Sequence, residues 1–494
     1  MAVNTWDGAV STDYNDADNW NTTGETDRVP TSADDVIIPD TSSINNCALS
    51  ATGGNPKNVN SFKIEANGTI IGNDIAIRVY GENGSGFAVD NDGIISGDLH
   101  LIIKTAATTT CDFNGTSGNF KNVEIDHSSC DATFHTDTTF DGTLTITAGT
   151  LKPQGGSTIT VAGDTSVTGT FGVASGSGSH SFGSLTINSG GTHIATSGTT
   201  TITNEISGAF ALDKHSSGTF THNSGTVEVT TNTNTFIDGF EGTVTSGSGA
   251  NALNNLIVNL SDSASYHFRL RPNSGTAHTI LGNLTVTQGM FELETDSHTL
   301  TVNGDVSVGA NGTLGRLAKT GNDSFGSLTI ASGGTYNATS GTTTITNRSG
   351  DFAWKNDGGT FTHNSGTVKL DTNTGNTDIH VDVKENIFYN FEMDMNATSH
   401  EVKLQDTSGN AVTILNNLTV TQGIFQSETA SDTYTINGLT KIKSGGTFMG
   451  DANHDTNKII HNGLVTNEGT YKINDGTTVK MNGGIRNLGT ITVA

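Results

Sequence analysis

The chain has little proline, cysteine and charge, and it lacks long runs of helix-forming or hydrophobic residues. Of its 494 residues, 5 are proline, 3 are cysteine and 15% are charged. The stretches of Leu, Ala, Glu and Lys that a helical protein needs are missing. The longest apolar runs resemble Leu101–Ile103, far short of the roughly 18 residues of a membrane span. We therefore expect neither a helical fold nor insertion into a membrane.

Positive charge is also scarce. The chain has 23 Lys and Arg against 49 Asp and Glu, which gives a formal net charge of −26. Such a field repels a phosphate backbone, and no Lys- or Arg-rich stretch interrupts it. We therefore expect no nucleic-acid partner.

The first residues, Met1–Asp7, contain neither a basic segment nor an apolar one, so no secretory signal is visible. The composition is typical of an extracellular protein, whereas this N-terminus is typical of a protein made and kept in the cytoplasm. The expected function therefore has to account for both an extracellular type of composition and a cytoplasmic type of N-terminus.

Cysteine is too scarce for a disulfide framework. Cys111 and Cys130 are separated by about one coil of a solenoid, so they are either buried free thiols or a bridged pair, and Cys47 is alone. No Cys-x-x-Cys or Cys/His zinc spacing occurs, and we expect no metal centre and no cofactor.

Glycine, by contrast, contributes 62 residues, and Thr, Val and Ile recur at alternating positions. Pairs such as Leu144/Ile146 and Leu185/Ile187 have one polar residue between two apolar ones, as in a strand with one buried face. Gly-Thr, Ser-Gly and Asn-Gly dipeptides between them supply turns. The pattern predicts an all-β chain.

Long internal repeats organise the sequence. Ser181–Ile187 (SFGSLTI) returns as Ser324–Ile330, and Gly218–Val227 (GTFTHNSGTV) returns as Gly359–Val368. Asn122, Asn255 and Asn390 begin equivalent segments. We predict an N-terminal cap over 1–40, first coils over 41–118, and three repeats over 119–251, 252–386 and, shortened, 387–494.

Each repeat is too long to be a single structural unit, so it must contain several coils. A string of β-sandwiches and a parallel β-helix both fit many short strands. Strands of three to five residues and evenly spread Gly, Ser, Thr and Asn favour a right-handed parallel β-helix, a solenoid of about 22 coils at roughly 22 residues each. Its thin core would accept ladders of Thr, Ser and Asn.

The N-terminal segment 1–40 differs from the repeats. Trp6 and Trp20, two of the three tryptophans, lie in it, and a solenoid needs such a cover over its first coil. We expect this aromatic N-terminal cap to be the attachment segment, through the residues Trp6, Tyr14, Trp20, Pro30 and Pro39.

The opening Trp6-Asp-Gly … Asp18-Asn-Trp20 … Pro30–Pro39 resembles that of β-helical virion proteins from marine and environmental bacteriophages. The SFGSLTI and GTFTHNSGTV repeats are similar to the bodies of such proteins and of bacterial surface β-helices. The resemblance covers nearly the whole chain, and it implies no catalytic residue.

Few residues stand out as candidate sites. His222 and His363 occupy equivalent positions of a repeat and are expected to be structural. Two acidic stretches, Asp90–Gly93 and Asp13–Asp18, have the oxygen ligands that calcium prefers, without EF-hand spacing, and solvated turns are the other interpretation. Paired carboxylates of a polysaccharide-cleaving spike would be sought at the alternating residues Glu292, Glu294 and Asp296.

We expect a structural, non-enzymatic bacteriophage virion protein, a fibre or appendage on tail or capsid that contacts the host surface. Such a protein is made in host cytoplasm yet works outside. It would join other virion proteins through its N-terminus, touch host glycan through lateral loops, and form a homotrimer. A bacterial adhesin or surface-layer protein and a polysaccharide-degrading tailspike are the alternatives. The trimer seam is expected at Phe220, Phe236, Phe240 and Phe361.

Overall fold

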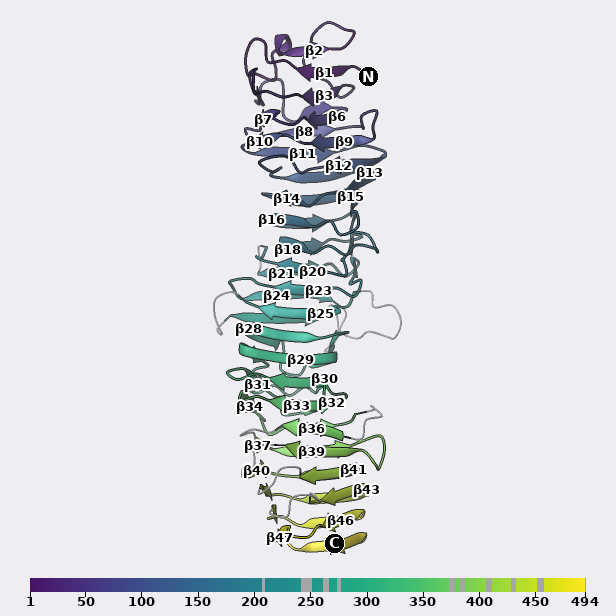
Figure 1. Ribbon diagram of the computed structural model, residues 1–494, viewed down its shortest axis with the longest axis vertical. Helices are drawn as coiled ribbons and strands as arrows, with labels where there is room; N and C mark the ends of the chain where they lie inside the picture. The colour runs from purple at the N-terminus through teal and green to yellow at the C-terminus, as the bar shows by residue number, and fades with distance from the viewer. Residues whose placement is uncertain are drawn as a thin grey trace. The chain divides into compact units, whose positions relative to one another are not determined.

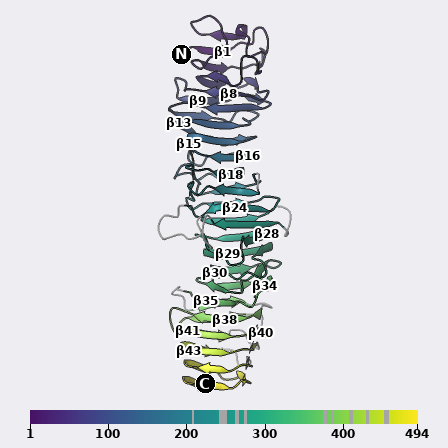
Figure 2. The same ribbon diagram turned by 180° about the vertical axis from the view of Figure 1, so that it is seen from behind.

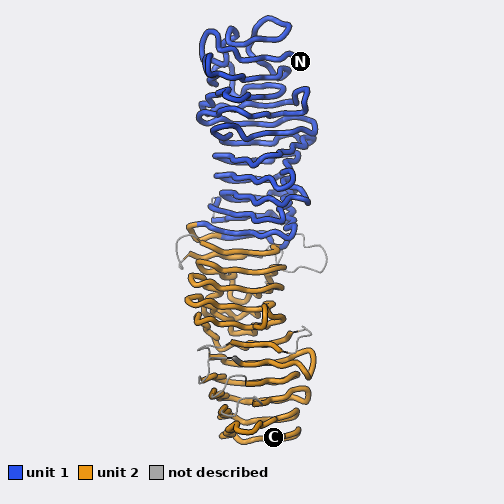
Figure 3. Tube along the Cα trace, in the orientation of Figure 1, with its two compact units in different colours: residues 1–231, 236–240, 248–252 blue, residues 232–235, 241–247, 253–494 orange. Residues whose placement is uncertain are grey.

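The computed structural model describes residues 1–206, 209–240, 251–260, 266–272, 277–372, 378–382, 387–405, 411–427, 432–450 and 457–493. The chain is all-β, with 57% of it in strands and 1% helical, and its parallel coils form a β-solenoid of about 18 turns (Figure 1). Two compact units are distinguished: unit 1 includes residues 1–231 and unit 2 includes residues 253–494 (Figure 3).

The first unit begins with β1 and contains one short 3₁₀ helix, η1 (Ala17–Asn19). Its strands are β1 Val3–Trp6, β2 Trp20–Thr22, β3 Asp35–Ile38, β4 Cys47–Ala48, β5 Lys57–Val59, β6 Ser61–Ile64, β7 Thr69–Ile71, β8 Ile75–Val79, β9 Phe87–Asn91, β10 Ile94–Ser96, β11 Leu99–Ile103, β12 Thr108–Asp112, β13 Val123–Phe134, β14 Thr138–Phe140, β15 Leu144–Pro153, β16 Ile159–Val167, β17 Thr170–Phe171, β18 His180–Ile187, β19 Thr192–Ile194, β20 Thr199–Ile202, β21 Phe210–Lys214, β22 Thr219–Thr221 and β23 Thr226–Val229; β24 (Thr235–Phe240) has residues in both units.

The strands of the second unit follow the same plan. They are β25 Asn255–Asn259, β26 His267–Pro272, β27 Ala277–Ile280, β28 Leu284–Leu293, β29 Thr299–Leu314, β30 Asp323–Ile330, β31 Thr335–Asn337, β32 Thr342–Ile345, β33 Phe352–Asn356, β34 Thr360–Thr362, β35 Thr367–Leu370, β36 Asp378–Asp382, β37 Ile387–Phe388, β38 Asn390–Asp394, β39 Glu401–Gln405, β40 Ala411–Ile414, β41 Leu418–Ser427, β42 Thr433–Ile436, β43 Thr440–Met449, β44 Lys458–His461, β45 Val465–Asn467, β46 Thr470–Ile473, β47 Thr478–Met481, β48 Ile485–Asn487 and β49 Thr490–Val493.

Within each unit, the strands of one coil stack on those of the next, as both views of the ribbon show (Figures 1 and 2). In β8, alternate residues are buried, and each pairs with a residue of the same orientation in β11, for example Ile77 with Leu101. Among the strand pairs whose register is described, only β1–β2 is antiparallel. The predicted parallel β-solenoid is therefore confirmed.

The coils are fewer and longer than the sequence predicted, because several strands continue through a bend. β13 has 12 residues and β29 has 16, and the register of β28 with β29 shifts between Val286 and Gln288. Most of the described strands have the expected three to five residues, and these longer elements are the exceptions.

The interior contains stacked aromatic rings in addition to Ile, Val and Leu. In unit 2, the ring centroid of Phe448 lies 5.3 Å from that of Phe425 and 5.0 Å from that of Tyr471, and both pairs are stacked. In unit 1, His193 stacks on Phe171 at 5.3 Å. Because each ring buries a large apolar area, the core buries more apolar area than the predicted ladders of Thr, Ser and Asn would.

Two of the four phenylalanines expected at a trimer seam lie in this interior. Phe220 is 1% exposed and Phe240 is 6% exposed, with their ring centroids 5.1 Å apart. The seam prediction is wrong for these two residues, because their rings fill the coil. Phe236 and Phe361 are half-buried.

Asparagine side chains link successive coils. The side-chain Oδ1 of Asn122 accepts a hydrogen bond from the backbone N–H of Thr143 at 2.9 Å, and that of Asn255 accepts one from Asn283 at 2.9 Å. The asparagines that align the repeats in the sequence thus hold the corners of adjacent coils together. The predicted borders of the repeats at 119, 252 and 387 stay a prediction.

Candidate functional site

The N-terminal cap is an aromatic cluster that closes the first coil. Trp20 lies with its ring edge-on to Trp6 and Tyr14, at centroid distances of 5.1 and 5.0 Å, and all three residues are at most 1% exposed. Trp20 Nε1 donates to the backbone oxygen of Tyr14 at 2.8 Å, and Trp6 Nε1 donates to that of Asn45 at 2.7 Å. The predicted aromatic cap is therefore present, and both indole N–H groups are satisfied.

The cap is joined to the solenoid through β1. This strand pairs antiparallel with β2, so that Trp6 lies opposite Trp20, and parallel with β3, so that Thr5 lies opposite Ile37. An antiparallel strand at this place covers the edge that a first coil would otherwise expose.

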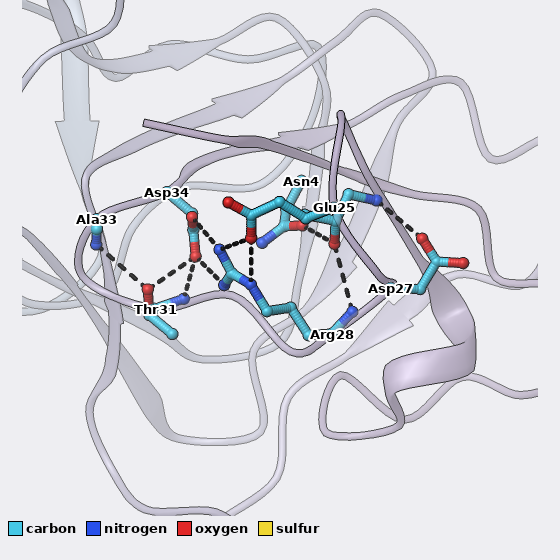
Figure 4. Close-up of polar contacts among 8 residues, drawn as sticks. Asn4, Glu25, Asp27, Arg28, Thr31, Ala33 and Asp34 are labelled. Carbon is cyan, nitrogen blue, oxygen red and sulfur yellow. Dashed lines mark hydrogen bonds and ion pairs between the residues drawn. The ribbon is translucent and has the colours of Figure 1, made fainter.

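The loop that leads from β2 to β3 is fixed by one arginine (Figure 4). Arg28 Nη2 donates to Asp34 Oδ1 at 2.7 Å, and Arg28 Nε donates to Glu25 Oε2 at 3.1 Å. Burial by itself raises the pKa of Asp34, but the hydrogen bonds from Arg28 and Thr31 outweigh it and lower the pKa to about 2. The loop therefore keeps this ion pair over the whole physiological pH range.

An open groove of about 470 Å³ runs beside this loop. Pro30 contributes to it, as part of the predicted attachment segment, whereas Pro39 is not among its lining residues. The groove is lined by Tyr14, Asn15, Val29, Pro30, Thr31, Ser32, Gly53, Pro56, Lys57 and Asn58.

Lys57 is the buried cation of the groove, and sequence reasoning missed it because its neighbours in the chain carry no motif. It is 4% exposed, its Nζ donates to Asn15 Oδ1 at 2.8 Å and to the backbone oxygen of Thr52, and it lies 5.7 Å from the ring centroid of Tyr14. Burial lowers the pKa of Lys57. The lining of the groove thus combines two prolines with a tyrosine and a lysine that are almost fully buried.

The three carboxylates considered for a hydrolase are each paired with arginine. Glu292 is 1% exposed and accepts hydrogen bonds from His267 Nδ1 at 2.9 Å and Arg269 Nε at 2.6 Å. Glu294 pairs with Arg271 at 3.0 Å, and Asp296 accepts from Arg316 Nε at 3.1 Å.

These contacts affect the pKa of two of the carboxyl groups. Burial by itself raises the pKa of Glu292, but the hydrogen bonds from His267 and Arg269 lower it overall, and the hydrogen bond from Arg316 lowers the pKa of Asp296. A general acid of a glycosidase needs a raised pKa. The pKa values of Glu292 and Asp296 are lowered instead, so neither group has the property of that acid.

One of the acidic stretches becomes part of a three-carboxylate cluster. Asp90 lies opposite Asp112 in the pairing of β9 with β12, and one oxygen of each of Asp90, Asp92 and Asp112 lies within 4.8 Å of the others. Lys63 Nζ already pairs with Asp90 at 2.9 Å. Asp112 was missed in the sequence because it lies one coil further along the chain.

The other acidic stretch forms turns of its own. Asp13 Oδ1 accepts the backbone N–H of Asn15 at 3.0 Å, and Asp16 Oδ1 accepts that of Asp18 at 3.1 Å. These Asx turns lead into η1, which agrees with the interpretation as solvated turns.

The repeated histidines also stabilise turns. His222 Nδ1 accepts the N–H of Ser224 at 2.8 Å, and His363 Nδ1 accepts that of Ser365 at 2.9 Å, in turns where both serines have φ near 60°. Their structural role is confirmed.

The three cysteines are buried and unbridged, as one of the two alternatives predicted. Burial raises the pKa of the Cys130 thiol to about 11 and that of Cys111 further. The pairing of β12 with β13 places Thr108 opposite Asp131, so Cys130 is out of register with Cys111.

Within the residues described above, no helix is long and apolar enough to cross a membrane. Comparison with protein-family models gives no match for this sequence, and neither the curated proteins nor the solved structures contain one that matches it.

Proposed function

We propose that the chain is a structural, non-enzymatic virion protein of a bacteriophage, a β-helical fibre or appendage on the tail or capsid, made in the host cytoplasm. In this proposal the N-terminal cap binds another virion protein, the chain forms a homotrimer, and lateral loops contact host glycan. The β-solenoid fold is compatible with this role and equally with that of a bacterial adhesin.

The observation that carries the proposal is the construction of the cap. Trp6, Tyr14 and Trp20 seal the interior, while the groove beside them stays open. A cover that served only to protect the first strand edge would need no such groove. Grooves lined by proline and aromatic side chains are suited to bind an extended segment of another protein.

A polysaccharide-degrading tailspike is the second candidate, because Glu292, Glu294 and Asp296 follow one another at alternating positions and each is held by an arginine. Release of reducing ends from host polysaccharide, lost in a Glu292→Gln variant, would favour this alternative. No release at all would favour the structural role.

The attachment is tested by filling the groove. Ser32 is exposed and lines the groove, so Ser32→Trp should block binding of a segment there without touching the buried cluster. We expect phage particles that carry this variant to incorporate at least tenfold less of the protein than wild type, measured by quantitative immunoblotting of purified particles.

The matched control is Ser85→Trp, which places the same ring on an exposed loop of unit 1 away from the groove. Normal incorporation of this control and strand-type circular dichroism of both variants are expected. Normal incorporation of Ser32→Trp would contradict attachment through the groove, and labelling of the bacterial surface instead of particles would favour the adhesin.

A further inference from the structure

A narrow cavity with one lysine and two acidic side chains in its lining lies in unit 2, where β28 ends and the loop before β30 folds back. Its volume is about 10 Å³, which leaves room for about one water molecule. Glu292, Lys319 and Asp323 line it together with Tyr336, and the rest of the lining includes Phe291, Leu300 and Leu314. An amine and two carboxyl groups are thus held together in mostly apolar surroundings.

Lys319 supplies the amine. It is 3% exposed, and its Nζ donates one hydrogen bond, to the backbone oxygen of Leu293 at 2.9 Å. Burial lowers the pKa of Lys319 to about 8. About a tenth of the side chain is therefore a neutral amine at pH 7, and a neutral amine is the nucleophilic form.

Asp323 supplies a carboxyl group that is easily protonated. It lies opposite Leu300 in the sheet, and its Oδ1 accepts the backbone N–H of Leu300 at 3.2 Å. Burial raises the pKa of Asp323 to about 7. The structure describes no ion pair between Asp323 and Lys319, although both line the same cavity, so neither charge is neutralised by direct contact.

Glu292 supplies a base. Its Oε1 is held by His267 and Arg269, whereas its Oε2 has no hydrogen-bond partner among the described residues, and the nearest cationic atom recorded for it is Arg316 Nε at 3.8 Å. Its side chain is fully buried. An ionised carboxylate with one free oxygen thus shares the cavity with the amine and the acid.

The first repeat has none of these three groups. Around the shared sequence SFGSLTI, Lys319 corresponds to Gly176 and Asp323 to His180, and around the shared Gly-x-Leu-Thr pattern Glu292 corresponds to Lys152. The three reactive groups therefore occur together only in the second of two otherwise similar coils.

We propose that Lys319 and Asp323 become joined by an amide bond in the folded chain, with Glu292 as the base that transfers the proton. Lys319 Nζ attacks Cγ of the protonated Asp323 and forms the N–C bond. Glu292 takes a proton from the nitrogen and delivers it to the departing hydroxyl group of Asp323, so that the C–O bond breaks and one water molecule leaves. Amine and acid give amide and water, and no oxidant or other reactant is needed.

The bond would remove two ionisable groups from an apolar site. A buried charge without a direct partner is costly, and an amide of the same atoms carries no charge. The loop closed by the bond is short, so its entropic contribution is small, and the main effect is to prevent ionisation of the pair.

The test is the intact mass of the purified full-length chain. We expect wild type to be lighter than its sequence mass by one water molecule and a protease digest to contain a peptide cross-linked between Lys319 and Asp323, with no tryptic cleavage after Lys319. Lys319→Arg and Asp323→Ala should have their full sequence masses. Glu292→Gln should also stay at full mass, or lose water at least tenfold more slowly after refolding.

Lys355→Arg is the matched control, since Lys355 is a surface lysine of the same repeat paired with Asp357 at 2.8 Å, and it should keep the water loss. Full mass of wild type with intact strand-type circular dichroism would overturn the proposal. Water loss that persists in Lys319→Arg would also overturn it, because it would indicate a succinimide at Asp323-Ser324 instead of the amide.

Discussion

At the scale of single residues, buried histidines distinguish this interior from an ordinary apolar core. His193 is 0% exposed, and neither of its ring nitrogens has a hydrogen-bond partner among the described residues. Burial lowers the pKa of His193 to about 3 and that of His180 to about 4. Both rings are therefore neutral in the folded chain and act as aromatic packing groups beside Phe171 and Phe182.

This burial predicts a loss of stability in mild acid. The unfolded histidine has a pKa of about 6.5, so the unfolded state binds more protons than the folded state as the pH falls below that value. Stability is complete above about pH 6.5 and falls progressively toward the folded pKa of about 3. At pH 5 the penalty from His193 alone is about 2 kcal/mol.

The variant His193→Phe removes that proton and keeps the stacking. We expect its free energy of unfolding to fall less between pH 7 and pH 5 than that of wild type, by about 2 kcal/mol, in denaturant titrations. His215→Phe, at an exposed position, is the control and should follow wild type. Equal losses in wild type and His193→Phe would contradict the assignment.

Residue-level predictions from the sequence succeeded where a local pattern determines the environment. His222 and His363 are expected to be structural because they occupy equivalent positions of a repeat, and the structure places both in turns. The prediction of a surface seam is wrong for Phe220 and Phe240, which are buried. The sequence does not show whether the interior of a coil has room for a phenylalanine ring, and only the packed coil does. Lys319 was missed because a loop carries it back over the coil.

At the scale of elements, columns of glycine set how closely the coils approach. Gly304 and Gly326 lie at one corner of successive coils, and a Cβ on Gly326 would be 2.5 Å from the backbone oxygen of Gly304. Gly163 and Gly183 repeat the arrangement in unit 1, with a corresponding distance of 2.6 Å. A side chain at these corners has to push two backbones apart.

We therefore expect Gly326→Ala to destabilise the chain by about 1–3 kcal/mol, the usual cost of overpacking. Gly84→Ala is the matched control, because its Cβ would meet no atom within 4 Å. Thermal unfolding followed by circular dichroism measures both. Equal melting temperatures for the two variants would show that the coils separate at this corner without cost.

The alternation of apolar and polar residues predicts the strands well, because a strand with one buried face requires only this local pattern. Leu144 and Ile146 are both buried in β15, as expected. The pattern could not predict where coils join, since the long strand β29 continues through its corner by hydrogen bonds to the neighbouring coils. Those hydrogen bonds depend on residues of β28 and β30, and the local sequence of β29 does not show which residues will be its partners.

At the scale of the whole molecule, the proposed trimer has a direct test. Of the expected seam residues, Phe220 and Phe240 lie in the core, and Phe236 and Phe361 are half-buried. The Phe361 ring packs against the buried rings of Trp354 and Phe388. Closed cyclic symmetry is the usual arrangement of identical chains. Light scattering should give three times the 51.2 kDa chain mass, and a stable particle with the mass of a single chain would contradict the trimer.

The sequence also predicted the cap, since Trp6 and Trp20 depart from the composition of the repeats. The role of the segment 1–40 is better tested by the point substitution in the groove than by deletion. Removal of this segment would take away β1, β2 and β3 together and leave the edge of β6 uncovered. Loss of attachment after deletion would then have two causes.

The matching register of β18 and β30 has a consequence for inheritance. Both strands contain the same heptapeptide, Ser181–Ile187 and Ser324–Ile330, in equivalent coils. Unequal recombination between the two corresponding stretches of the gene would add or remove one whole repeat. Each strand at the new junction would then pair with a strand equivalent to its present neighbour. The length of the solenoid can therefore change during evolution by whole repeats, because the strand pairing at each new junction already exists in the chain.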